Sequence, residues 1–240
     1  GYAGGIISLF IMLFFFFDEG GKTFGLGLEP GFGWLDAQNR EGTRAVGPLI
    51  AIWFAIFMLP FFLWVREGKT PNRLGGLRRS LADLRHTLKN MVKRPSLFAF
   101  MGAQMFYRDA LNGLYAFGGV YAVLVLGWGQ TQIGVFGILG GLSAAIVTQI
   151  SGKYDQKLGP LPVIYFHIYV LIIVSLCIIG MSRDSFFGLA LQEGSALPDV
   201  MFYICGAAIG GSGGGIYAAS RSMMVRHTNP DRPTEAFGLF

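Results

Sequence analysis

The stretch FYRDALNGLYAFGGVYA, Phe106–Ala122, places two adjacent charged residues, Arg108 and Asp109, inside a long apolar run. Between Leu97 and Leu126 this pair supplies the only formally charged side chains. A charge at bilayer depth costs roughly 2.5–3.5 kcal/mol on insertion scales, so it persists mainly where it faces protein or water. The stretch therefore predicts a membrane-spanning helix in a protein with a polar interior, an arrangement typical of transporters.

The composition of the whole chain favours the same class. Hydrophobic residues make up 52% of the 240 residues and charged residues only 14%, against about 25% in soluble domains. A single soluble core cannot accommodate so many apolar side chains. The composition therefore predicts a membrane protein whose partners include the lipid bilayer.

Six apolar stretches approach or exceed the roughly 20 residues that cross a hydrocarbon core of about 30 Å. The first is short, and because the chain begins at Gly1 we interpret it as the remainder of a helix whose beginning is missing. The fold class that we expect is all-α, a polytopic transmembrane helical bundle with about six spans. The predicted spans are Tyr2–Phe17, Ala45–Val65, Leu97–Leu126, Gln132–Ile150, Leu161–Met181 and Val200–Ala219.

The basic residues between these spans alternate from loop to loop. Residues 66–96, 151–160 and 220–240 hold 14 Lys and Arg, whereas the intervening loops hold 4. Because cytoplasmic loops are enriched in Lys and Arg, the segment 66–96 is expected to lie in the cytoplasm. Topology thus explains the net charge of +5, and no nucleic-acid partner is expected. We expect a multi-pass integral membrane protein, and the expected location is a bacterial inner (cell) membrane.

The basic segment also divides the chain. Residues 1–65 hold two predicted spans, 66–96 form a linker, and 97–240 hold four spans. This layout fits a transporter made of two six-helix halves, with the last two helices of the first half and the first four of the second. Apolar residues at helical spacing in 77–92 predict an amphipathic helix, lying either on the membrane surface or against the bundle.

Polar residues of the Leu97–Leu126 span share one face. At 100° per residue, Gln104, Arg108, Asn112 and Tyr115 form a stripe, with Asp109 about 60° beyond Asn112. The functional interpretation is a substrate or proton pathway, in which Asp109 accepts a proton or pairs with an amine and Arg108 contacts a carboxylate. The alternative is a buried ion pair or an inter-helix hydrogen bond without a transport role.

Glycines in the same span and in the last span suggest hinges or close helix packing. Gly118 and Gly119 lie just beyond the polar stripe, and Gly210 and Gly214 are spaced by four residues, as in tightly packed membrane helices. His167 is either a proton relay or a packing residue. We expect no cofactor, no metal site and no catalytic residues, because none of the usual motifs for these is present.

The segment Gly152–Pro160, GKYDQKLGP, resembles a loop pattern of the major facilitator superfamily, on Gly152, Asp155, Lys157 and Gly159. The resemblance implies a gating loop between the second and third helices of a half. We locate this loop after the fourth predicted span, which is where the pattern is expected.

Three further segments resemble the vacuole-effluxer, or autophagy-related permease, branch of that superfamily. They are GYAGG at Gly1–Gly5, NGLYAFGGVYA at Asn112–Ala122 and ASRSMMVRHTNPDRPTEAFGLF at Ala219–Phe240. In the last segment, Ser220, Arg221 and Ser222 match a Ser-Arg-Ser at the end of the tenth helix, which we interpret as a cytoplasmic gate.

The resemblance implies a secondary active transporter that works by alternating access and exports a small-molecule substrate. Amino acids are the implied substrate class, and coupling to protons is expected. A non-transporting scaffold, sensor or lipid-binding protein on the same fold is the alternative. Neither interpretation is that of an enzyme.

Overall fold

A computed structural model describes residues 2–19, 22–24, 26–36, 38–66, 89 and 94–227. The predicted amphipathic helix of the linker lies outside the described residues, apart from Lys89. The last part of the family-like segment Ala219–Phe240, residues 228–240, lies outside them as well.

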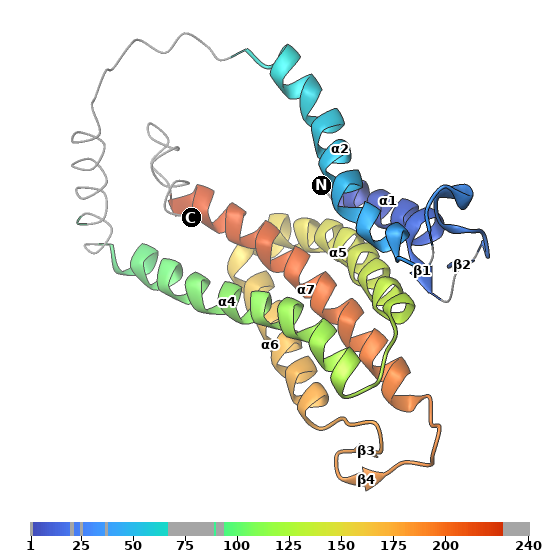
Figure 1. The fold of residues 1–240 in the computed structure, drawn as a ribbon. Helices are drawn as coiled ribbons and strands as arrows, with labels where there is room; N and C mark the ends of the chain where they lie inside the picture. Colours follow the sequence, from blue (N-terminus) through green and yellow to red (C-terminus); the bar gives the residue numbers. More distant parts are fainter. Residues whose placement is uncertain are drawn as a thin grey trace.

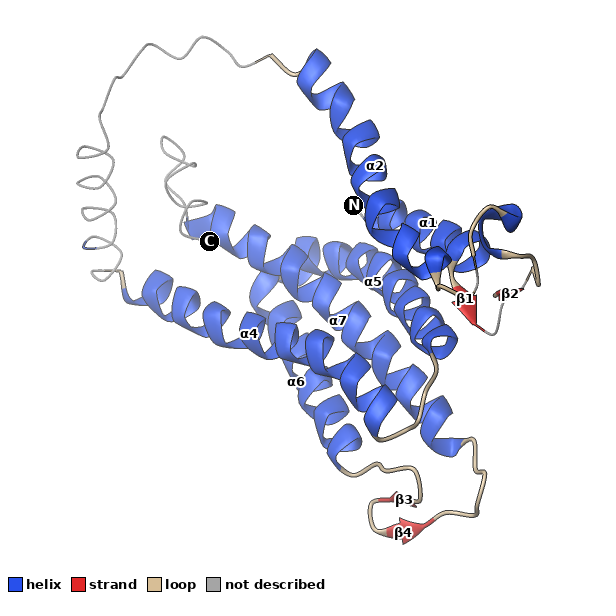
Figure 2. Ribbon diagram, viewed as in Figure 1, coloured by secondary structure: helices blue, strands red, loops and turns tan. Residues whose placement is uncertain are grey.

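Helices form nearly all of the regular structure (Figures 1 and 2). The strands of the described chain form two antiparallel hairpins of two residues per strand. In order, the elements are α1 (Tyr2–Ile11), the π-helical turn η1 (Met12–Phe16), β1 (Asp18–Glu19), β2 (Lys22–Thr23), the 3₁₀ turn η2 (Pro30–Gly33), α2 (Glu41–Trp64), α4 (Pro95–Leu124), α5 (Gln130–Leu158), α6 (Pro160–Ile179), β3 (Ser185–Phe186), β4 (Leu189–Ala190) and α7 (Leu197–His227).

Each of the six predicted spans contains a helix, which confirms the all-α fold class. Within the described residues, α2, α5, α6 and α7 are long and apolar enough to cross a membrane, against about six expected. The two remaining helices differ for separate reasons. The apolar part of α1 and η1, Gly4–Phe16, is too short, whereas the 30-residue α4 carries polar residues in its central turns that lower its mean hydropathy.

α7 is the centre of the bundle and contacts α4, α5 and α6 (Figure 1). Its glycines explain how closely it approaches α5. A β-carbon on Gly210 would collide with the backbone carbonyl of Gly140, and one on Gly206 would overlap the ring of Phe136. Small residues permit this close backbone approach, which provides the van der Waals packing that holds membrane helices together.

The N-terminal helices lie at one side of this bundle. α1 packs on α5, where Leu9 lies over Gly137, and Leu13 of the following η1 lies over Gly134. α2 extends away from the bundle (Figure 1), and its apolar side chains are largely exposed. Such a surface on a spanning helix faces lipid or further helices, since lipid tails are as apolar as leucine.

The turn between α5 and α6 is shorter than the sequence predicted. The span predicted to end at Ile150 continues as helix to Leu158, so that Gly152, Asp155 and Lys157 belong to the last turns of α5. Only Gly159 separates the two helices, and its φ of +88° is a conformation that glycine adopts without strain. The predicted boundary was wrong because polar residues end the apolar pattern without breaking the helix.

The opposite end of the bundle is closed by contacts around Asp199, at the start of α7. The indole nitrogen of Trp128, in the α4–α5 turn, donates to Oδ1 of Asp199 at 2.5 Å. Arg183, in the α6–α7 connection, donates to both carboxylate oxygens at 2.8 Å. The ring of Trp128 also packs edge-on against Phe202. These contacts join both connections to α7.

Candidate functional site

The polar stripe on α4 meets α7 through Tyr217. The guanidinium carbon of Arg108 lies 5.1 Å from the centre of the Tyr217 ring, within the range of a cation–π contact. The hydroxyl of Tyr217 donates to Oδ1 of Asn112 at 3.4 Å. One aromatic side chain of α7 thus positions two polar residues of α4 that are one helical turn apart.

The other members of the stripe lie above and below this contact. Gln104 is buried, with 3% of its surface exposed, whereas Tyr115 is about half-exposed. The hydroxyl of Tyr115 lies against Gly213, where a β-carbon would collide with it. The stripe therefore runs along the interface between α4 and α7.

Asp109 occupies a different environment from Arg108. Its side chain is exposed, and among the described residues it lines neither the polar cavity beside Arg108 nor the cavities beside Leu114 and His167. Adjacent residues on a helix point 100° apart, which directs Asp109 away from Tyr217. The sequence brought these two residues together as one candidate site, and the fold separates them.

A polar cavity of about 640 Å³ lies among α1, α4, α5 and α7. Its polar lining consists of Arg108 from α4, Thr148 from α5, and Tyr217 and Arg221 from α7. Glycines and apolar side chains of α1, α5 and α7 form the rest of the wall among the described residues. Gly214, Tyr217, Ala218 and Arg221 follow the i, i+3, i+4, i+7 spacing of one helix face, so this face of α7 borders the cavity over about 10 Å.

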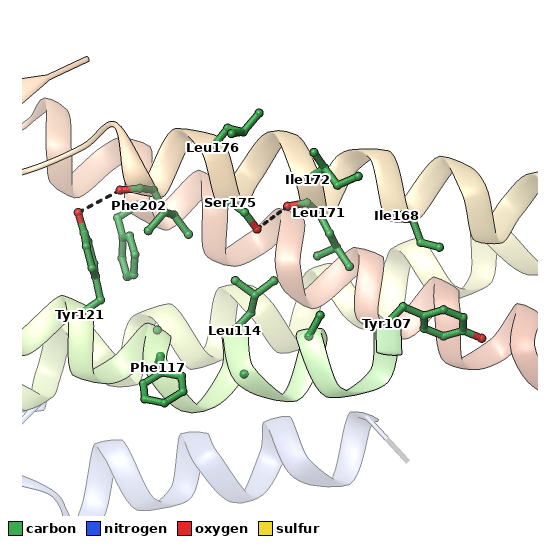
Figure 3. A pocket seen from close by; sticks show the side chains of 14 residues that line it. Tyr107, Leu114, Phe117, Tyr121, Ile168, Leu171, Ile172, Ser175, Leu176 and Phe202 are labelled. Atoms are coloured by element: carbon green, nitrogen blue, oxygen red, sulfur yellow. Dashed lines mark hydrogen bonds between the residues drawn. The ribbon is translucent and has the colours of Figure 1, made fainter. Parts of the chain in front are cut away.

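A second cavity, of about 540 Å³, lies between α4 and α6 and is almost entirely apolar (Figure 3). Leu114 and Leu171 point toward each other across it. Two of its polar groups bind neighbouring backbone: Ser175 donates to the carbonyl of Leu171 at 2.8 Å, and Tyr121 donates to the carbonyl of Ile178 at 3.3 Å. This cavity offers a solute no charged group among the described residues.

A third cavity, of about 380 Å³, lies between α5 and α6 beside His167. Nε2 of His167 lies 2.8 Å from Oγ of Ser151, and both residues are buried. A β-carbon on Gly215 would collide with the imidazole ring, so α7 packs directly on it. His167 is thus a buried contact among three helices, and it does not line the cavity that holds Arg108.

The last turns of α7 hold the residues interpreted as a cytoplasmic gate. Ser220 is fully buried, and its Oγ lies 2.6 Å from the hydroxyl of Tyr107 on α4. Arg221 is exposed and enters the polar cavity, while Ser222 is half-buried. Arg226 pairs with Asp155 of α5 at 3.7 Å. The predicted gating segment of α5 and the end of α7 therefore lie together.

The family model described as "Vacuole effluxer Atg22 like" matches residues 1–240. This chain belongs to the vacuole effluxer Atg22-like family. No match is found among curated proteins or among solved structures. Family membership confirms the resemblance inferred from the sequence, and with it a multi-pass membrane transport protein.

Within this Atg22-like chain, sequence reasoning missed two residues of the polar cavity, Tyr217 and Thr148. Tyr217 follows a run of glycines, where its ring gave no more signal than that of any other aromatic membrane residue. Thr148 is a single hydroxyl in an apolar helix. The spacing from Gly214 to Arg221 could have pointed to Tyr217, because these residues share a helix face with it.

The glycines of the Atg22-like chain differ in their surroundings. α4 continues as one helix through Gly118 and Gly119. A β-carbon on Gly118 would lie 3.9 Å from the ring of Phe136, and one on Gly119 would meet open space. Gly210 packs on α5, whereas Gly214 borders the polar cavity. The four glycines singled out by sequence therefore lie in different surroundings, and Gly210 is in close contact with the backbone of another described helix.

Proposed function

We propose that this protein is a secondary active transporter that exports small organic solutes by alternating access, with the polar cavity as part of its solute site. The observation that carries the proposal is the position of Arg108, half-buried near the middle of the 30-residue α4 and lining a cavity of about 640 Å³. A charged group at this depth is costly and is a functional-site candidate by default.

The placement of the cavity supports a rocking mechanism. We assign α1 and α2 to the first half of a two-bundle transporter and α4–α7 to the second half, joined by the linker 66–96. On this assignment the cavity lies between α1 of the first half and α4, α5 and α7 of the second. Alternating access requires a site between the two halves, so that rocking of one against the other exposes it to each side in turn.

Proton coupling is assigned to Asp109. The side chain lies on α4 next to Arg108 but faces outward from the described bundle. In a bilayer a carboxylate at this depth is stabilised by a protein partner or a water path, or it takes up a proton. A proton exchanged there is close enough along α4 to influence the cavity without occupying it.

The family supports export, whereas the solute class, the orientation and the membrane are proposals. A family described as effluxers supports export, and amino acids are the first solute class to test. The charge pattern of the loops supports an orientation with the linker 66–96 in the cytoplasm. We keep a bacterial cell membrane as the proposed location, although the family description names the vacuole.

The proposal is tested by solute flux in proteoliposomes that carry the full-length protein, with and without an imposed pH gradient. Wild type and Asp109→Asn are compared, with Asp184→Asn, an exposed residue outside the helices, as the control. We expect gradient-driven flux in wild type and in the control, and its loss in Asp109→Asn. Gradient-driven flux that survives Asp109→Asn contradicts the assignment of coupling to this residue. If no solute moves, the non-transporting scaffold is the better description.

A further inference from the structure

The charged side chains that line the polar cavity among the described residues are all positive. Two arginines, Arg108 and Arg221, line it, and no aspartate or glutamate is among the described residues of its wall. Arg221 forms no ion pair with any described residue, whereas Arg183 pairs with Asp199 and Arg226 pairs with Asp155. Two guanidinium groups that line one cavity favour an anion there, because an anion offsets their mutual repulsion.

The hydrogen-bonding groups of the wall point to the same ligand charge. The hydroxyl oxygen of Thr148 is buried and has no hydrogen-bond partner among the described residues. Tyr217 already donates to Asn112, and its ring supports the Arg108 guanidinium. The two guanidinium groups of the wall can only donate hydrogen bonds, and the Thr148 hydroxyl can donate one. A carboxylate or phosphate oxygen is the acceptor that such a set of donors matches.

The shape of the cavity sets the size of the ligand and its route. The side chain of Arg221 is exposed and that of Arg108 is half-buried, so the lining of the cavity includes one arginine that reaches solvent. Gly137 and Gly141 keep the α1–α5 side tight, because a β-carbon on either would approach Leu9 or Ile6 at 3.3 or 3.1 Å. A volume of about 640 Å³ accommodates a small organic molecule.

We propose that the transported solute is a small organic anion whose carboxylate or phosphate group is bound by Arg108 and Arg221, with the Thr148 hydroxyl as a further donor. This inference rests on the proposed transport function and narrows it to a substrate class. Among amino acids it favours the acidic ones over neutral or basic ones. The planar guanidinium can grip either oxyanion with two parallel hydrogen bonds, which an ammonium group does not provide.

The first experiment compares solutes on the wild-type, full-length protein in proteoliposomes. The probes are succinate, glutamate, glycerol 3-phosphate, leucine and lysine, each as a labelled solute and as a competitor. We expect at least one of the three anions to be carried and to compete, and leucine and lysine to do neither. Comparing the transport of succinate and glutamate with that of glycerol 3-phosphate distinguishes recognition of a carboxylate from recognition of a phosphate. Transport of leucine without competition by any anion overturns this inference and leaves the proposed transporter intact, whereas flux of no solute overturns both.

The second experiment assigns the site. Arg108→Gln and Arg221→Gln are each expected to raise KM for the carried anion about tenfold to a hundredfold, the range for losing a hydrogen bond to a charged group. Arg108→Lys and Arg221→Lys should recover only part of this loss, because they keep the charge without the planar fork. Thr148→Val should raise KM less, because it removes one neutral donor and leaves a side chain of similar shape.

Arg44→Gln is the matched control, because Arg44 is exposed on α2 and lines none of the described cavities. Its KM should equal that of wild type. Size-exclusion profiles in detergent establish that each variant is folded, and the Lys variants keep the test valid if a Gln variant aggregates. An anion KM that is unchanged in folded Arg108→Gln and Arg221→Gln overturns the assigned site.

Discussion

The hydroxyl oxygens of Tyr107 and Ser220 lie 2.6 Å apart and join α4 to α7 at a point where Ser220 is completely buried. Either hydroxyl can donate, but each needs the other, because the surroundings are the apolar side chains of Phe100, Ile164 and Met224. This contact lies one residue from Arg108 on α4 and one residue from Arg221 on α7. It therefore fixes how the two arginines of the polar cavity are placed relative to each other.

Tyr107→Phe is expected to lower the free energy of unfolding by about 0.6–2 kcal/mol, because it leaves the buried Ser220 hydroxyl without a partner. Ser220→Ala should cost a similar amount. The double variant should cost little more than either single change, since both hydroxyl groups are then gone. Thermal or denaturant unfolding in detergent, followed by circular dichroism, measures all three. Strictly additive losses would show that the two hydroxyls do not depend on each other.

The positions of the helices followed from the sequence, but their partners did not. Apolar length located six helices, and helical spacing predicted the stripe of Gln104, Arg108, Asn112 and Tyr115. Both are local properties of one segment. Tyr217 of α7 contacts both Arg108 and Asn112 because of how two helices pack. The spacing of residues within one segment does not encode this packing. The pairing of Trp128 with Asp199, 71 residues away, is of the same kind.

The separation of Arg108 from Asp109 has a similar cause. Helical geometry states that the two side chains diverge by 100°, but not which of them faces the neighbouring helix. The packing of α7 decides this, and it selects Arg108. The end of α5 shows the opposite limitation, because a drop in hydropathy after Ile150 marked the end of the apolar pattern and not the end of the helix, which runs to Leu158.

Gly210→Ala is expected to destabilise the bundle by about 1–3 kcal/mol, because its new methyl group would collide with the Gly140 carbonyl and force α5 and α7 apart. Gly102→Ala is the matched control. Its methyl group would meet open space on α4, so it should be neutral or slightly stabilising through helix propensity. The same unfolding measurement compares the two, and equal stabilities would contradict the close packing of α5 on α7.

Asp199→Asn is expected to loosen the connection between α6 and α7. The carboxylate binds Trp128 and Arg183, whose side chain is partly exposed, so the ion pair contributes about 0.2–1 kcal/mol. Asn keeps an oxygen for Trp128 but loses the charge, and Asp199→Ala loses both contacts. Amide hydrogen exchange at Ser182 and Leu191, whose amides bond within this connection, should therefore rise in the order wild type, Asn, Ala.

Asp184→Asn is the control for this series, because Asp184 lies in the same connection but is exposed and makes no side-chain ion pair with a described residue. Its exchange rates should match those of wild type. If Asp199→Ala also matches wild type, the contacts at Asp199 do not hold the connection in place.

Asp155 and Arg226 link the ends of α5 and α7, with Arg226 half-exposed and Asp155 largely buried. If alternating access separates these helix ends, their ion pair stabilises only one of the two states. Asp155→Asn should then shift the balance between the states by up to about 1 kcal/mol and change the maximal flux up to about fivefold. Arg226→Gln should act in the same direction, and the charge exchange Asp155→Arg with Arg226→Asp should restore part of the wild-type flux. Flux in proteoliposomes is compared with the unfolding temperature of each variant, with Lys153→Gln, an exposed change on α5, as the control. A change in unfolding temperature without a change in flux would limit this pair to a structural role.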